Sequence, residues 1–125
     1  MSYIERHTVT VTTDAAGAGT GYTPMINGKI LQIVYDKPGS GGFDDGSTMT
    51  VTGESSGTPI WTESAVNADA TRLPRTQVCG TTGTALTYDG TRIVAEPVAI
   101  ANERVKIAVT AGGNVKTGTF YIVVG

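Results

Sequence analysis

Few side chains in this sequence could act as a nucleophile or as an acid–base catalyst. The chain has one histidine, His7, and one cysteine, Cys79, so nucleophilic catalysis with a histidine base would have to use His7. No local motif surrounds either residue, and His7 falls in a run that alternates like a β-strand. We therefore expect His7 to be an ordinary strand residue, and a small hydrolase built on it is the least favoured function.

Metal chemistry has equally little support in the sequence. Zinc sites use several Cys or His ligands, and this chain has one of each. Asp36, Asp44, Asp45 and Glu54 could supply oxygen ligands for calcium, but their spacing is not that of an EF-hand loop. Aspartates near glycine also favour turns, which is the interpretation we prefer. The sequence predicts no metal site.

Two other possible sites, a carboxylate pair for sugar hydrolysis and a phosphate-binding loop, lack the residue spacing or the structural context that their chemistry needs. Glu54 with Glu63, or the adjacent Asp44 and Asp45, would be poor carboxylate pairs for sugar hydrolysis. Residues 112–117 resemble a phosphate-binding loop, but no glycine directly precedes the lysine and the segment joins two predicted strands. We predict no catalytic residue, no cofactor and no enzyme activity.

The composition indicates a globular all-β protein. The 125 residues are 39% hydrophobic and 16% charged, and the 17 glycines suit a fold with many turns. A net charge of −2 argues against nucleic acid as a partner, because phosphate contacts depend on clustered Lys and Arg. The first residues do not form a signal peptide, and no apolar run is long enough to span a membrane. We expect a protein made in a cytoplasm, with no membrane partner.

Apolar residues that alternate with polar ones predict the strands. Val105, Ile107 and Val109 share one face of a run that is followed by a Gly-rich connection and by the apolar residues 119–125. Together these segments predict an antiparallel hairpin that closes the fold. Further strands are predicted at residues 6–13, 29–36, 47–53, 58–62 and 98–100.

The connections between these strands are predicted from their turn residues. Asn27-Gly28 predicts a turn, and the Ala- and Gly-rich residues 14–21 predict a flexible loop. Asp89-Gly90 predicts the type I′ turn of a compact hairpin over residues 85–94. Residues 63–77 show no period and predict a long loop.

These elements predict an all-β fold, a two-sheet antiparallel β-sandwich of about eight strands, with a jelly roll as the alternative arrangement. A single domain spans residues 1–125, with residues 1–5 as an N-terminal arm and residues 63–77 as the long loop.

Six residues are candidates for contact with a partner: Tyr3, Ile4, Phe43, Arg72, Leu73 and Arg75. The two arginines could grip an acidic surface or remain solvated on their loop. Phe43, in a Gly-rich loop, is either a plug of the core or a contact residue. Trp61 is expected to be a buried anchor, and stacking on a sugar is the alternative.

Four segments of the sequence carry a resemblance to known proteins: residues 60–63, 70–75, 101–107 and 112–120. Together they resemble small proteins encoded among the head genes of tailed bacteriophages and prophages, some of which are capsid decoration or cement proteins. The resemblance covers residues 22–125. It implies a structural protein of the virion that binds the outside of the capsid at capsomer junctions and stabilises the shell.

The same resemblance implies the major capsid protein as partner and a homo-oligomer, with a trimer favoured. Its implied location is the capsid surface, after synthesis in the cytoplasm of a bacterial host. The alternatives are a receptor- or carbohydrate-binding module of a phage tail fibre, and a head-completion or tail-tube protein.

Overall fold

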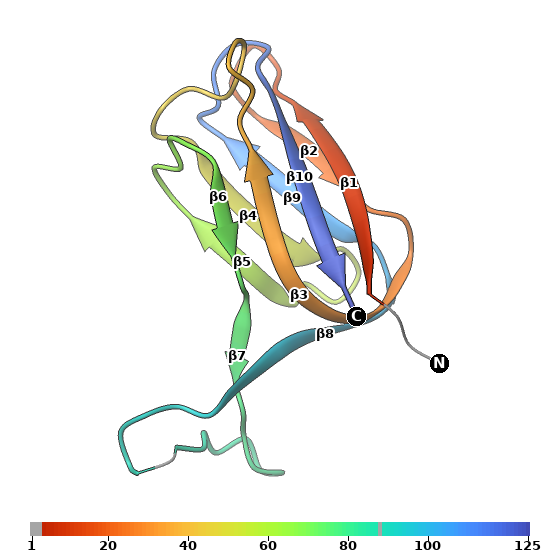
Figure 1. Cartoon of the computed structure of the whole chain (residues 1–125), viewed down its shortest axis with the longest axis vertical. Helices are drawn as coiled ribbons and strands as arrows, with labels where there is room; N and C mark the ends of the chain where they lie inside the picture. Colours follow the sequence, from red (N-terminus) through yellow and green to blue (C-terminus); the bar gives the residue numbers. More distant parts are fainter. Residues whose placement is uncertain (1–3, 88) are drawn as a thin grey trace.

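The computed structural model describes residues 4–87 and 89–125. These residues form ten β-strands and no helix, arranged as two antiparallel sheets that face each other (Figure 1). The six strands of the larger sheet are β1 (Glu5–Thr12), β3 (Ile26–Asp36), β6 (Ala70–Arg72), β7 (Arg75–Gln77), β8 (Ala95–Glu103) and β10 (Thr117–Val124). The four strands of the smaller sheet are β2 (Gly19–Tyr22), β4 (Thr48–Gly53), β5 (Pro59–Glu63) and β9 (Val105–Thr110). The predicted two-sheet β-sandwich is confirmed.

The core lies between the two sheets and follows from the alternation of the strands. On the smaller sheet β9 buries Val105, Ile107 and Val109, while its intervening residues face outwards. On the larger sheet β10 buries Phe120 and Ile122 towards them. Burying each such side chain stabilises the fold by about 1.5–3 kcal/mol, so the period-two pattern is what holds the sheets together.

The predicted closing hairpin was wrong in its pairing. β9 pairs with β2 and β4 in the smaller sheet, whereas β10 pairs with β1 and β3 in the larger one. The connection between them, residues 111–116, therefore crosses from one sheet to the other. The buried Thr13 stabilises this crossing, because its hydroxyl donates to Gly113 O at 2.7 Å and accepts from Lys116 N at 2.8 Å.

Two predicted connections are strand segments. Asn27-Gly28 lies inside β3, where the pairing with β8 shifts register and Gly28 has a φ of 138°, so it forms a β-bulge and not a turn. Part of the predicted loop 14–21 belongs to β2, whose Gly21 is buried. A Cβ atom on Gly21 would lie 2.6 Å from Val9 Cγ1, so only glycine allows β2 to approach β1 this closely.

Two further predictions need correction. The long loop 63–77 contains β6 and β7, which pair with β3 and β8. Among the described residues of the compact hairpin 85–94, Thr87 forms an isolated bridge with Ile93, whereas a two-residue type I′ turn at Asp89-Gly90 would place Thr87 opposite Arg92. Asp89 Oδ1 instead accepts hydrogen bonds from Thr91 N and Arg92 N.

Glu103 is a buried acid at the end of β8, only 7% exposed. Its Oε1 accepts hydrogen bonds from Ser56 N at 3.0 Å, from Ser55 N at 2.9 Å and from the Ser56 hydroxyl at 3.2 Å. These bonds, led by the one from Ser56 N, hold the pKa of Glu103 below its ordinary value of 4.5. The carboxylate thus fixes the turn after β4 to the end of β8.

This arrangement predicts how stability depends on pH. Because the pKa of Glu103 is lower in the folded chain than in the unfolded one, its contribution is complete above about pH 4.5 and is lost as the pH falls through the folded value. We expect Glu103→Gln to lower the urea midpoint at pH 7, with the difference from the unaltered protein shrinking below pH 4.5. Glu96→Gln, at an exposed position of the same strand, is the control. A Glu103→Gln difference that stays constant from pH 7 to pH 3 would contradict this role.

Candidate binding surface

The side chains considered for chemistry do not form a catalytic or metal-binding cluster. His7 lies on β1, and its Nε2 is 3.4 Å from Glu5 Oε2 without a hydrogen bond to any described residue. Cys79 is exposed on the segment between β7 and β8. Within residues 4–87 and 89–125, no three His, Cys, Asp or Glu side chains are grouped so that they could hold a metal ion. No helix in this part of the chain could span a membrane.

The structure places the predicted contact residues in different environments. Ile4 and Leu73 are exposed, at 69% and 60%. Arg72 makes a bidentate ion pair with Glu63, with N–O distances of 2.7 and 2.8 Å. This pair connects β6 of the larger sheet to β5 of the smaller one. Arg75 belongs to β7 and donates to Leu31 O. Tyr3 lies outside the described residues.

Phe43 belongs to the core, which decides between its two predicted roles. It is 1% exposed and stacks with Tyr35, with ring centroids 5.8 Å apart, while Phe120 lies 6.4 Å from it. Trp61 is half-buried against the core, and its Nε1 donates to Glu63 Oε1 at 3.2 Å. The loop that carries Phe43 is therefore anchored to the sandwich and does not present this ring to a partner.

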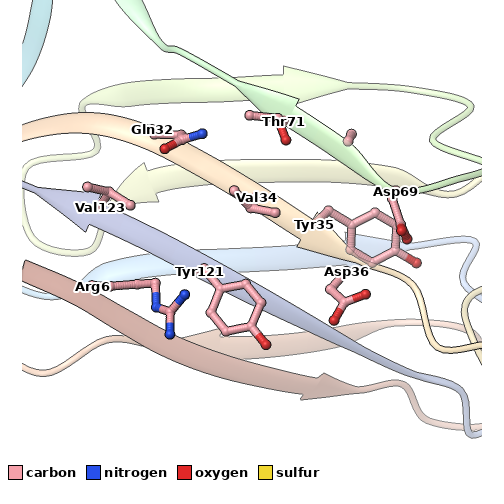
Figure 2. Close-up of a pocket in the computed structure, with 10 residues that line it drawn as sticks. Arg6, Gln32, Val34, Tyr35, Asp36, Asp69, Thr71, Tyr121 and Val123 are labelled. Carbon is pink, nitrogen blue, oxygen red and sulfur yellow. The ribbon is translucent and has the colours of Figure 1, made fainter.

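A groove of about 500 Å³ crosses the outer face of the larger sheet (Figure 2). The pairing register places its floor residues side by side: Tyr121 of β10 lies opposite Val34 of β3, and Val123 lies opposite Gln32. Tyr121, Val34 and Val123 are half-buried, so the floor carries three largely apolar side chains beside Gln32 although it faces outwards. The groove is lined by Arg6, Gln32, Val34, Tyr35, Asp36, Asp69, Ala70, Thr71, Tyr121 and Val123.

The two ends of the groove carry opposite charges. At one end the Arg6 guanidinium lies over the Tyr121 ring, 4.9 Å from its centroid. At the other end are the carboxylates of Asp36 and Asp69 (Figure 2). Burial, followed by the nearby Asp69 carboxylate, raises the pKa of Tyr35 to about 12, so its hydroxyl stays protonated at neutral pH. The Tyr35 hydroxyl makes no hydrogen bond to any described residue.

A second feature is an extension that projects from one end of the sandwich (Figure 1). It consists of residues 75–97, that is β7, the first three residues of β8 and the segment between them. None of its described residues is buried. Leu86 and Ile93 are 42% and 54% exposed. The described residues of the extension thus form no hydrophobic core of their own, and between β7 and β8 they form only isolated bridges and turns.

Backbone hydrogen bonds hold the segment between β7 and β8 together. Val78 N donates to Val94 O at 2.7 Å, Val94 N donates to Leu86 O at 3.2 Å, and Leu86 N donates to Val78 O at 2.8 Å. The three residues therefore form a closed ring of hydrogen bonds. Such a structure satisfies its backbone groups but leaves its apolar side chains in water.

Comparisons with known proteins add little to this description. No protein-family model matches the chain, and no curated protein matches it. The chain is similar to one solved structure, described as the crystal structure of FlhE, with a TM-score of 0.46 and 9% sequence identity over 98% of each chain. A likeness this distant says nothing more about what the chain does.

The predicted function needs correction in the light of this comparison. No family model or curated protein points to a role on a phage capsid, and the distant likeness to FlhE gives such a role no support. We therefore set aside the decoration or cement function, together with the tail-fibre and head-completion alternatives.

The groove and the extension were both missed in the sequence. The signal for the groove was that residues 119–124 are β-branched or aromatic on both faces of the strand. In the structure the second face, with Tyr121 and Val123, is the groove floor. The signal for the extension was that Leu86 and Ile93 stand among Thr and Gly with no complete apolar face.

Proposed function

We propose that this chain is a non-enzymatic assembly module, a stiff β-sandwich that attaches to another protein through the extension. The observation that carries this proposal is a hydrogen-bonded projection in which none of the described residues is buried. A two- or three-stranded unit without a core is marginally stable in water. A partner that covers Leu86 and Ile93 would supply the burial that the extension lacks.

The attachment of the extension supports a role in docking. β8 continues without interruption from the extension into the body, where its Val98 and Ile100 are buried and pair with β3. At the base, Arg75 Nη1 donates to Leu31 O at 3.3 Å. The body therefore holds the extension in a defined direction, so little conformational entropy is lost when a partner binds it.

The experiment is a photo-crosslinking scan in the cells that produce the chain. We expect a photoreactive amino acid at position 93, on the extension, to give one defined crosslinked protein. The same group at position 20, exposed on β2 of the smaller sheet, serves as the matched control and should give none. Excess Leu86→Asp protein should fail to compete for the crosslink, whereas the unaltered protein should compete. Equal yields at positions 93 and 20, or no product at position 93, would refute the proposal.

A further inference from the structure

We infer that the partner is a second copy of this chain, and that the extension of one copy lies in the groove of the next. This inference rests on the proposed function, because it names the protein that the extension binds. Both complementary surfaces belong to the same chain: an exposed apolar projection, and an outward groove with an apolar floor. The contact would bury Leu86 and Ile93 against Val34 and Tyr121.

The charges of the two surfaces match. The extension presents Arg92, whose side chain is 81% exposed, beside Asp89. The groove presents the Asp36 and Asp69 carboxylates at one end and the Arg6 guanidinium at the other. Arg92 of one copy would meet Asp36 and Asp69 of the next, because a cation is attracted to the end that holds two acids. This contact would break the ion pair within the extension, in which Arg92 Nε lies 3.6 Å from Asp89 Oδ2.

The geometry requires that the contact is made between copies. β7 pairs with β8 along the extension, and β8 pairs with β3 in the body. These ladders direct the extension beyond the end of the sandwich (Figure 1), whereas the groove is lined by Asp69 and by residues of β1, β3, β6 and β10. To reach that groove, the extension would have to give up its pairing with the body. The resulting contact joins two different surfaces, so it is head-to-tail and produces a ring or a filament.

The test is a pair of charge reversals measured by sedimentation velocity over a range of protein concentrations. The unaltered protein should self-associate, and more weakly at high salt. Asp36→Arg and Arg92→Asp should each lower the association constant at least tenfold. An equimolar mixture should regain association, since the intact extension of the first variant fits the intact groove of the second, and the two altered surfaces also have opposite charges. Lys106→Asp, on β9 of the smaller sheet, is the matched control and should associate like the unaltered protein.

The outcomes separate this inference from the proposed function. Circular dichroism and the thermal midpoint confirm that each variant is folded. A monomeric unaltered protein at every concentration, single variants that associate normally, or a mixture without recovery would each overturn the inference. A crosslink from position 93 to a different protein would also overturn it while leaving the proposed function intact. No crosslink at all would remove both.

Discussion

Replacing Phe43 with alanine should destabilise the fold by about 3–5 kcal/mol, the usual cost of truncating a fully buried aromatic side chain. Phe43 is 1% exposed and stacks on Tyr35, which in turn stacks on Phe120 with ring centroids 5.1 Å apart. The loss would leave a cavity between the sheets and release the Gly-rich loop that carries the ring. Because small domains are stable by only about 5–15 kcal/mol in total, the variant should be near the limit of folding.

Chemical denaturation at pH 7 measures this effect. Phe43→Leu refills part of the cavity and should cost less than Phe43→Ala. Ile93→Ala removes an apolar side chain of similar chemistry from the exposed extension, so we expect it to change the unfolding free energy of the isolated chain by less than about 0.5 kcal/mol. If Phe43→Ala cost no more than Ile93→Ala, the three-ring cluster would not be an anchor of the core.

Gly118→Ala should cost about 1–3 kcal/mol, because it adds a methyl group to a space that two rings already fill. A Cβ atom at this position would lie 2.5 Å from Phe43 Cε2 and 2.8 Å from Tyr35 Cε1. Gly118 does not have a positive φ, so the cost arises from the side-chain contacts and not from backbone strain. The rings cannot withdraw easily, since each is stacked on its neighbour.

A double-mutant cycle identifies the cause of this cost. In the Phe43→Leu background the obstructing Cε2 atom is absent, so Gly118→Ala should be less destabilising there than in the unaltered protein. Gly39→Ala is the control, because a Cβ at that position has no heavy atom within 4 Å. Equal costs of Gly118→Ala in both backgrounds would show that Phe43 is not the group that excludes a side chain.

The strands could be predicted from the sequence because burial imposes a local pattern. β3, β4, β5 and β9 lie where alternation or a continuous apolar run places them. The same pattern does not specify a strand's neighbour, and for that reason β9 and β10 were assigned to one hairpin. The apolar faces of both strands are buried whether the strands pair with each other or face each other from two sheets. In the structure Ile107 and Ile122 are both buried, although they belong to different sheets.

Phe43 and the Asn27-Gly28 pair show the limits of local signals. A single aromatic residue in a Gly-rich loop has no period, so its burial depends on whether the loop folds back over Tyr35. Asn-Gly is typical of turns, yet here glycine serves a bulge that Asn27 also stabilises, since its Oδ1 accepts from Asn102 N at 2.7 Å. Both outcomes depend on residues distant in the chain.

The sequence by itself determined the all-β class, the two-layered core and the positions of most strands, because these depend on which residues along a short segment avoid water. The tertiary structure decided the assignment of strands to sheets, the outward apolar floor at Tyr121 and Val34, and the projection of residues 75–97 from the body. Those features depend on pairing between segments far apart in the chain. Hydrogen bonds between backbones are nearly independent of side-chain type, so their partners are fixed only when the whole core packs.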